Sequence, residues 1–269
     1  MGVLNVTPDS LSDGGLYAGV DAAVAQAHQM AADGADILDI GGESTRPATF
    51  RDQSPLPAAE EMRRILPVIA RLAAELPQVS LSVDTYKAEV AAAALDAGAS
   101  LVNDISGLTY DPEMAALVAL RGVPVVLMHM PGQPRALPAY PVYADVVVDI
   151  SDFFRRQIAY AEARGVRRDQ IRLDPGLGFG KTIQHNLEIL RRLHEFTSFG
   201  LPLVVGASRK KFLGTILGTD DPLDRKEGTA AAVALCIAAG ADIVRVHDVR
   251  EMARVARVSD AIVRGWDET

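Results

Sequence analysis

The sequence predicts an α/β protein with the (β/α)₈ barrel (TIM-barrel) fold, built as a single domain over residues 1–269. Three observations predict this fold. Eight short runs rich in Val, Ile and Leu alternate with eight Ala-rich amphipathic segments, at roughly 34 residues per unit. The apolar runs are nearly continuous, as in parallel strands that are covered on both faces. No Gly-x-Gly-x-x-Gly motif follows the first run, which disfavours the competing open, doubly wound sheet.

Each predicted strand is a short aliphatic run bounded by polar or turn-forming residues. In chain order, the strands are expected at residues 3–6, 36–40, 79–83, 101–105, 124–128, 171–173, 203–205 and 242–247. Each predicted helix has apolar residues at helical spacing. The helices are expected at residues 21–33, 58–75, 87–97, 112–121, 144–164, 184–194, 209–239 (broken near 218–224) and 249–264. Glycines that favour a left-handed C-cap end several helices or precede the next strand, at Gly34, Gly98, Gly122, Gly165, Gly200 and Gly240.

Composition and charge exclude several classes of protein. With 49% hydrophobic and 23% charged residues, the chain is typical of a soluble globular protein. Its longest apolar stretch, Ala230 to Ala241, is shorter than the roughly 20 residues that span a bilayer, so no membrane segment is expected. The net charge of −8 argues against binding to nucleic acid or to an anionic membrane. The first residues lack the basic and then apolar pattern of a signal peptide.

The single cysteine indicates a reducing compartment. Cys236 has no second cysteine with which to form an internal disulfide. It lies in an apolar helical run, so we expect a buried, inert thiol rather than a nucleophile. A cytoplasmic location is therefore predicted.

Polar residues gather at the predicted carboxyl ends of the strands, where barrel enzymes have their active sites. Cations follow the last two strands. Arg245 and His247 are two residues apart and share one face of a strand; if that face is the lumen, Arg245 needs an anion as its partner. Ser208, Arg209 and Lys210 add cationic side chains and helix-start N–H groups. This corner is interpreted as a phosphate or pyrophosphate cradle, with pairing of Arg245 to an internal carboxylate as the alternative.

Acidic and amide groups are expected opposite this cradle. Asp84, Asn103 and Asp174 would repel one another unless a ligand donates hydrogen bonds to them. A planar heterocycle with adjacent ring N–H and amino donors, such as a 2-amino-4-oxopyrimidine, meets that need. The other groups assigned to this slot are Lys210, for the ring oxygen, and the apolar walls Met128 and Phe179.

Several of these residues have structural alternatives. Asp84 and Asp104 fit helix caps, residues 174–176 fit a turn, and Ser208 fits a cap as well as a ligand contact. His129 is interpreted as a hydrogen-bonded core or rim histidine, because no His or Cys cluster accompanies it. The remaining helical histidines are predicted to be surface residues: His28, His185 and His194.

Seven ordered segments closely resemble the dihydropteroate synthase family, and the resemblance runs through essentially the whole chain. They are residues 1–10, 41–47, 82–85, 103–106, 174–179, 206–210 and 245–248. The resemblance implies a transferase of folate biosynthesis. Such an enzyme condenses 6-hydroxymethyl-7,8-dihydropterin diphosphate with 4-aminobenzoate to give 7,8-dihydropteroate and pyrophosphate. A homodimer is the assembly expected from the family.

The resemblance also implies roles for individual residues. The pterin would be held by Asp84, Asn103, Asp174 and Lys210, and the diphosphate by Arg245 and His247. Asn5 would bind the Mg²⁺ that accompanies the diphosphate. Thr45 and Arg46 would belong to the second mobile loop. The residues expected to act in catalysis are Lys210, Arg245, His247 and Asp9, with Ser208, Met128 and Phe179 as further substrate contacts.

The implied mechanism is an S_N1-like loss of diphosphate, because the reduced pterin donates electrons to the methylene carbon while Mg²⁺ and cations stabilise the leaving group. Residues 7–16 and 42–56 are expected to close over the site and exclude water. Three departures from the family pattern lie near the expected aminobenzoate pocket and leave sulfonamide sensitivity open: Leu11, Ala48 and Lys211.

Two other functions are weighed against the synthase. A pterin-binding methyltransferase would need a corrinoid partner and has no use for a diphosphate cradle. A non-catalytic paralogue would bind pterin but not aminobenzoate, and the three departures motivate this alternative.

Overall fold

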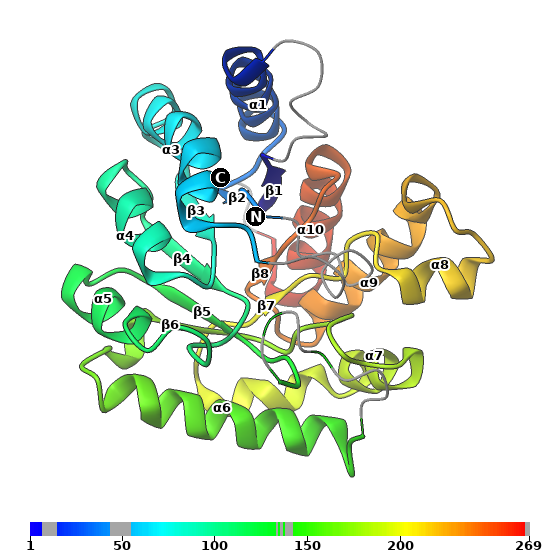
Figure 1. The fold of residues 1–269 in the computed structure, drawn as a ribbon. Coiled ribbons are helices and arrows are strands. Elements are labelled where there is room, and N and C mark those ends of the chain that lie inside the picture. Colours follow the sequence, from blue (N-terminus) through cyan, green and yellow to red (C-terminus); the bar gives the residue numbers. More distant parts are fainter. Residues whose placement is uncertain (7–14, 44–54, 133, 135–136, 138–141, 267–269) are drawn as a thin grey trace.

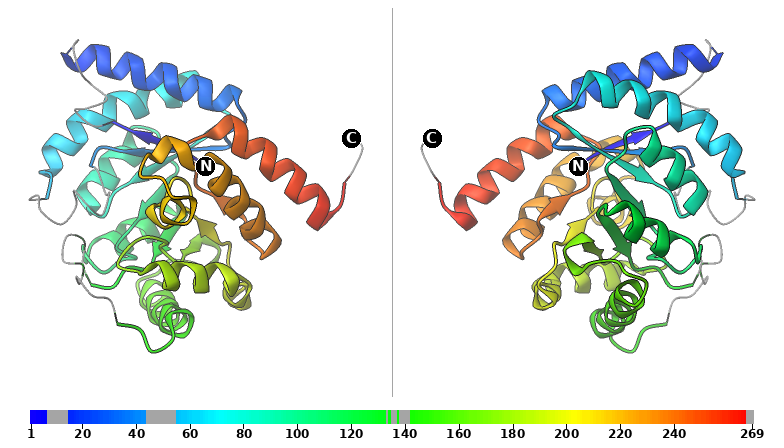
Figure 2. Two further views of the ribbon diagram at one scale, coloured as in Figure 1. Left: turned by 90° about the vertical axis from the view of Figure 1, so that its right-hand side faces the viewer. Right: turned by 90° about the vertical axis from the view of Figure 1, so that its left-hand side faces the viewer.

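The computed structural model describes residues 1–6, 15–43, 55–132, 134, 137 and 142–266. Over these residues, parallel strands form a closed barrel with the helices around it (Figures 1 and 2). The predicted (β/α)₈ barrel is confirmed.

The strands of the barrel pair in chain order. Their bounds are β1 Gly2–Asn5, β2 Ile37–Gly41, β3 Ser80–Asp84, β4 Leu101–Asp104, β5 Val125–Met128, β6 Ile171–Asp174, β7 Val204–Val205 and β8 Ile243–Val244. Strands β1 to β6 form one continuous parallel sheet, and β7 pairs with β8. Two parallel bridges complete the ring, Leu173 with Leu203 and Gly2 with Val246. At the second bridge, the N–H of Val3 donates to the carbonyl of Val246 over 3.0 Å.

The helices follow the predicted order with shifted ends. Their bounds are α1 Gly15–Ala32, α3 Ala58–Glu75, α4 Ala88–Asp96, α5 Met114–Arg121, α6 Val146–Glu162, α7 Ile183–Arg191, α8 Lys211–Leu217, α9 Lys226–Ala238 and α10 Val249–Arg264. The predicted break at 218–224 is confirmed, since α8 ends at Leu217 and α9 begins at Lys226. Helix α1 begins six residues earlier than the predicted 21. Short 3₁₀ helices lie at Arg168–Gln170, Leu193–Phe199 and Pro222–Arg225.

Local sequence signals explain where helices start and stop. The Asp145 carboxylate accepts hydrogen bonds from the N–H groups of Val147 and Val148 and so caps α6. Thr182 and His185 form a reciprocal capping box at the start of α7. All six predicted helix-ending glycines have positive φ angles, between 64° and 113°.

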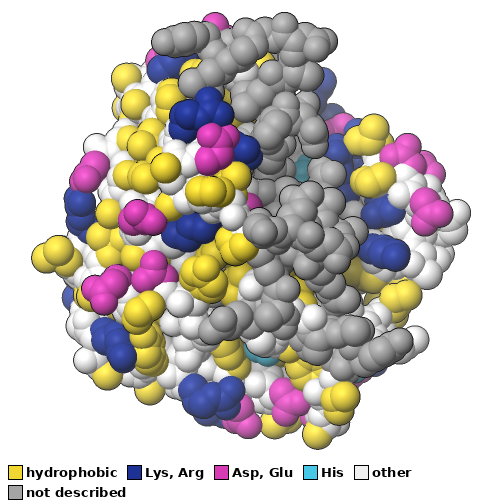
Figure 3. All heavy atoms as spheres, in the orientation of Figure 1, with side chains coloured by type: hydrophobic (Ala, Val, Ile, Leu, Met, Phe, Trp, Pro, Cys, Tyr) yellow, Lys and Arg dark blue, Asp and Glu magenta, His cyan; other side chains and the backbone are white. Residues whose placement is uncertain are grey.

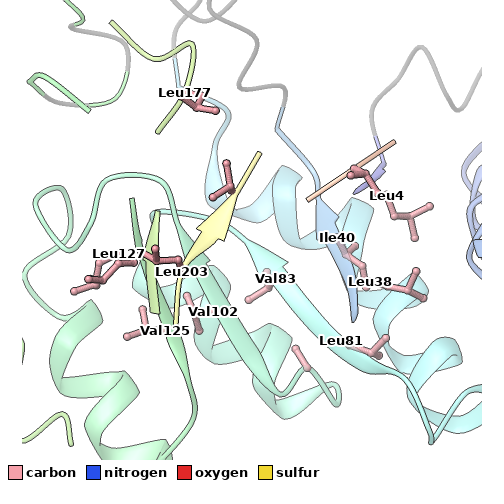
Figure 4. Close-up of a cluster of buried hydrophobic side chains, with 14 of the residues drawn as sticks. Leu4, Leu38, Ile40, Leu81, Val83, Val102, Val125, Leu127, Leu177 and Leu203 are labelled. Carbon is pink, nitrogen blue, oxygen red and sulfur yellow. The ribbon is translucent and has the colours of Figure 1, made fainter. Parts of the chain in front are cut away.

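The main hydrophobic core lies between the barrel and the surrounding helices. Alternate strand residues point outward into it; Figure 4 shows Leu38 and Ile40 from β2, Leu81 and Val83 from β3, and Leu127 from β5. The residues between them point into the lumen. A small apolar cluster lies in the lumen, formed by Met1, Leu101, Val126 and Val204 with Ile37 and Ile243. Asp39, between Leu38 and Ile40, is fully buried in the lumen and belongs to a polar layer.

The described helices, the charges at the surface and the single cysteine bear on expectations drawn from composition. No described helix has both the length and the apolar character that a membrane span requires. On the face drawn in Figure 3, positive and negative side chains are interspersed. Cys236 is buried, and burial raises the pKa of its thiol to about 12, so the expected inert thiol is confirmed.

Candidate active site

A pocket opens at the carboxyl ends of the strands. It contains about 340 Å³ of space not filled by protein, part of it open to solvent. Its lining comes from β4, β5 and β6 and from the segments that follow β4, β6, β7 and β8: Asn103, Ile105, Met128, Asp174, Gly176, Leu177, Phe179, Gly206, Lys210 and Arg245. Six residues that were singled out in the sequence are therefore brought together here: Asn103, Met128, Asp174, Phe179, Lys210 and Arg245.

Arg245 lies in the lumen and pairs with two buried carboxylates. Its Nε donates to Oδ2 of Asp39 over 2.6 Å, and its Nη2 donates to Oδ2 of Asp84 over 2.8 Å. Burial alone would lower the pKa of the guanidinium, but the two carboxylates outweigh burial and raise it. The expectation that Arg245 needs a bound anion is wrong, because internal carboxylates already balance its charge. The sequence also predicted acidic groups on one side of the barrel mouth and cations on the other. This is wrong for Arg245, which lies directly against Asp39 and Asp84.

Asp84 keeps one oxygen without a partner. Its Oδ1 is buried and accepts no hydrogen bond from any described residue. Burial raises the pKa of this carboxyl, and the neighbouring Arg245 opposes the rise. The capping alternative for Asp84 is wrong, because the first N–H of α4, that of Ala88, donates to Asp111 over 2.8 Å.

Asn103, at the end of β4, and Asp174, at the end of β6, both line the pocket, as the predicted ring slot requires. The Nδ2 of Asn103 donates to Oδ2 of Asp39 over 3.0 Å. One oxygen of Asp174 accepts the N–H of Gly176 over 2.7 Å, so this residue both forms a turn and lines the pocket. Burial raises the pKa of Asp174, although the positive charges of Lys210 and Arg245 oppose the rise.

Lys210 covers an aromatic wall of the pocket. Its Nζ lies 4.5 Å from the ring centroid of Phe179, a cation–π distance. Burial, reinforced by the charge of Arg245, lowers the pKa of this ammonium to about 8. Phe179 and Met128 belong to one buried apolar cluster, together with Tyr86, Ile105, Met130 and Leu137.

The loops after β7 and β8 meet at Ser208 and His247. The Ser208 hydroxyl accepts the N–H of His247 over 3.1 Å and lies 3.0 Å from its Nδ1. Burial and the positive neighbours lower the pKa of His247 to about 3, so the imidazole is neutral at pH 7. The predicted cap by Ser208 is wrong, since Lys210 is the N-cap of α8. Arg209 does not join the cradle as expected, because it pairs with Asp248 over 2.6 Å.

Asp104 and His129 have structural environments. Asp104 does not cap a helix; it accepts bonds from the N–H and hydroxyl of Ser106 and from the N–H of Leu108, which shape the loop after β4. His129 is a buried core residue, and burial lowers its pKa to about 2. The expected core position is confirmed, and of the two ring nitrogens Nδ1 has no hydrogen-bond partner among the described residues. Of the three predicted surface histidines, His194 is exposed, His28 pairs with Glu75 at the surface and His185 is half-buried.

Some predicted residues cannot be placed. Asp9, Thr45 and Arg46, and the departures Leu11 and Ala48, lie outside the described residues. Asn5 ends β1 and is half-buried. Lys211 is exposed at the first position of α8.

Sequence reasoning missed two residues that organise this site. Asp39 joins Arg245, Asn103 and Ser82, whose hydroxyl donates to it over 2.6 Å. The sequence signal that could have identified Asp39 is an acidic residue flanked by aliphatic residues within a predicted strand. Lys181 has no comparable signal, because its contacts are to backbone: its Nζ donates to three carbonyls and holds the loop after β6.

Comparisons with known proteins agree with this geometry. The model of the family described as pterin binding enzyme matches residues 1–247. The dihydropteroate synthase of Synechocystis sp. (strain PCC 6803) is 47% identical over 264 residues, covering 98% of this chain and 90% of that protein. A structure of the Xanthomonas albilineans dihydropteroate synthase with 4-aminobenzoic acid superposes with a TM-score of 0.89 at 44% identity, covering 97% of this chain and 92% of that one.

A second structure from that organism is in complex with 7,8-dihydropteroate and has a TM-score of 0.86 at 42% identity, with coverage of 97% and 92%. The matched region covers nearly the whole chain in each comparison. The chain therefore belongs to the dihydropteroate synthases, pterin-binding transferases of folate biosynthesis.

Proposed function

We propose that this chain condenses 6-hydroxymethyl-7,8-dihydropterin diphosphate with 4-aminobenzoate, giving 7,8-dihydropteroate and pyrophosphate. The observation that carries the proposal is the acidic character of the pocket: Asp174 lines it, and Asp84, bonded to the lining Arg245, keeps a buried Oδ1 that lacks a donor among the described residues. A buried carboxylate oxygen without a donor is costly, and a ligand with N–H groups removes that cost. The related X. albilineans structures hold 4-aminobenzoic acid and 7,8-dihydropteroate, which supports one proposed substrate and the proposed product.

The pterin ring fits between the polar and apolar walls of the pocket. Asn103 and Asp174 line the pocket and offer acceptors for the ring N–H and amino groups, and Asp84, bonded to the lining Arg245, offers a further acceptor. Met128 and Phe179 offer flat apolar contact, and Lys210 beside Phe179 supplies a donor for the ring oxygen.

The diphosphate fits toward the ends of β7 and β8. Lys210 supplies positive charge there, and the neutral His247 supplies one N–H. Arg245 retains a role as a donor, because its Nη1 makes no hydrogen bond to the described part of the chain. Ser208 orients His247 through the 3.0 Å contact with Nδ1.

The residues present fit the Mg²⁺ that the family implies. Asn5 carries an amide oxygen, a donor type that Mg²⁺ accepts. Within the described ranges, no group of three or more His, Cys, Asp or Glu side chains is placed to hold a metal by itself. This suits a Mg²⁺ held mainly by substrate phosphates, with Asn5 as the protein ligand. Bound there, Mg²⁺ would neutralise charge on the leaving diphosphate.

The proposed chemistry substitutes one group on the methylene carbon. The C–O bond to diphosphate breaks, and electrons from the reduced pterin ring stabilise the cationic carbon. Lys210 stabilises the departing anion by charge, and Arg245 donates a hydrogen bond to it from Nη1. The neutral amine of 4-aminobenzoate then forms the C–N bond and loses a proton to solvent, so it needs orientation more than activation. Asp9, Thr45 and Arg46 are proposed to act in the loops that exclude water.

Product analysis tests the proposal directly. The purified chain is incubated with the pterin diphosphate, 4-aminobenzoate and Mg²⁺, and dihydropteroate is measured by chromatography. We expect product, and we expect a strain that lacks the synthase to be rescued. Binding of 6-hydroxymethylpterin without product or rescue would instead identify a non-catalytic paralogue.

Two variants test the site assignment by calorimetry. Asp174→Ala removes a ring acceptor and should abolish measurable binding of 6-hydroxymethylpterin. Arg245→Ala should weaken the diphosphate ester far more than the free hydroxymethylpterin. Equal losses for the two ligands would refute the placement of the diphosphate.

We also propose a homodimer that forms through α9 and α10, in the cytoplasm. These neighbouring helices expose Leu235, Val258 and Ile262, and Trp266 is exposed just after α10, with exposed fractions from 61% to 79%. Such a set of apolar side chains is typical of an interface. Analytical ultracentrifugation should give a dimer for the unchanged chain and a monomer for Ile262→Glu. A monomeric unchanged chain would refute the assembly.

A further inference from the structure

We infer that Asp39 is a positioning residue that sets the direction in which Asn103 presents its amide and the place at which Arg245 is held. The inference rests on the proposed function in taking a pterin as the ligand. It assigns ligand discrimination to a residue that does not touch the ligand.

The contacts of Asp39 use both of its oxygens. Its Oδ1 accepts the hydroxyl of Ser82 over 2.6 Å. Its Oδ2 accepts Nδ2 of Asn103 over 3.0 Å and Nε of Arg245 over 2.6 Å. The residue is 0% exposed, and it is not part of the pocket lining, whereas Asn103 and Arg245 are. Asp39 therefore acts on a ligand only through these neighbours.

A carboxylate fixes the orientation of an amide because it accepts hydrogen bonds and cannot donate them. The 3.0 Å contact places the NH₂ group of Asn103 against Asp39. The flipped amide would place its oxygen against a carboxylate oxygen, an unpaired and repulsive arrangement in a buried site. Asn103 is thereby set to offer its Oδ1 to the pocket, and no described residue donates to that oxygen.

Asp39 fixes Arg245 at the same time. The guanidinium is planar, and its Nε and Nη2 are held by Asp39 and Asp84 respectively. Asp39 on β2 and Asp84 on β3 together fix the plane of the guanidinium, whereas Asp84 alone would leave the group free to rotate about a single hydrogen bond. The same carboxylate thus orients two of the groups that line the pocket.

The variant Asp39→Asn keeps the size of the side chain and removes its charge. The new amide can donate to Oδ1 of a flipped Asn103, so the fixed direction is lost. We expect the affinity for 6-hydroxymethylpterin, measured by calorimetry, to fall at least tenfold. The matched control is Asp36→Asn, the same chemical change at an exposed carboxylate that precedes β2, and it should bind like the unchanged chain.

A reciprocal variant separates positioning from folding. Asp39→Asn combined with Asn103→Asp restores a hydrogen bond between the two positions with donor and acceptor exchanged. We expect the urea midpoint to return toward that of the unchanged chain, while pterin affinity stays low because the neutral amide at position 39 no longer holds the guanidinium of Arg245 by charge. If the single variant fails to fold, the reciprocal variant decides alone.

Two outcomes would overturn the inference. One is pterin affinity in Asp39→Asn within twofold of the unchanged chain. The other is recovery of both stability and affinity in the reciprocal variant, which would show that Asp39 serves folding only. If the unchanged chain does not bind 6-hydroxymethylpterin, the proposed function fails and this inference fails with it.

Discussion

Replacing Arg245 by Met tests whether charge holds the lumen of the barrel together. The guanidinium pairs with Asp39 and Asp84, whose side chains are 0% and 5% exposed. Its removal leaves two carboxylates in the interior without their cation. Breaking a buried ion pair from one side costs roughly 3–5 kcal/mol, so we expect the free energy of unfolding at pH 8 to fall by that amount.

The pH dependence of this loss gives a sharper test. Burial raises the pKa of Asp84 and Arg245 opposes the rise, so the variant should have a still higher pKa at this carboxyl. A folded-state pKa above the unfolded value means that the folded state binds the proton more tightly, and stability is regained as the pH falls. Each unit by which the folded-state pKa of Asp84 is higher in the variant than in the unchanged chain recovers about 1.4 kcal/mol of the lost stability at a pH below both values. The loss should therefore be smaller at pH 5.5 than at pH 8.

Urea unfolding followed by circular dichroism at both pH values measures the loss. The control is Arg209→Met, which breaks the pair with Asp248, where the arginine is 25% exposed. It should cost about 1 kcal/mol or less, with little change over this pH range. A loss below 1 kcal/mol for Arg245→Met at pH 8, or a larger loss at pH 5.5, would refute the reasoning.

Three further predictions concern buried titratable groups. Burial lowers the pKa of His129 to about 2, so the unfolded chain takes up a proton below pH 6.5 that the folded chain does not, and stability is lost on acidification. By pH 5, urea unfolding should show a loss of about 2 kcal/mol that is absent in His129→Phe. The same pH dependence of stability in the unchanged chain and in the variant would contradict this. Lys210 has a pKa lowered to about 8, so the affinity for pyrophosphate should decline as the pH rises past that value, and calorimetry should show no such step in Lys210→Met. Lys181→Met leaves three backbone carbonyls without their donor, so the free energy of unfolding should fall by about 1–3 kcal/mol. Pterin binding should also weaken, because these carbonyls belong to segments beside the pocket. Unchanged pterin affinity would show that this loop does not influence the pocket.

The fold was predictable because its signals are local. Aliphatic runs, helical spacing and glycines such as Gly98 and Gly240 report the conformation of their own segment. Strand β8 was predicted at 242–247 but spans only Ile243–Val244. Its ladder depends on β7 and on the bridge to Gly2, which lie far away in the sequence.

The site was predictable in position but not in pairing. Polar residues at successive strand ends must meet in a barrel, which is why Asn103, Asp174 and Lys210 line one pocket. Nothing local specifies whether Arg245 pairs with a ligand or with Asp39, because 206 residues separate the two. Asp39 itself was detectable, since an acid that alternates with two outward-facing aliphatic residues must face the lumen.

The polar layer in the upper lumen constrains how this chain can evolve. In a hydrocarbon interior, one aliphatic residue can replace another at small cost. A neutral residue at position 39 would leave Arg245 with one carboxylate partner instead of two and Asn103 without its acceptor, so replacements in this layer are favoured when complementary changes occur together. Viable changes in this layer are thus expected to come in pairs, whereas single substitutions are tolerated more readily in the outer loops, where related sequences should differ first.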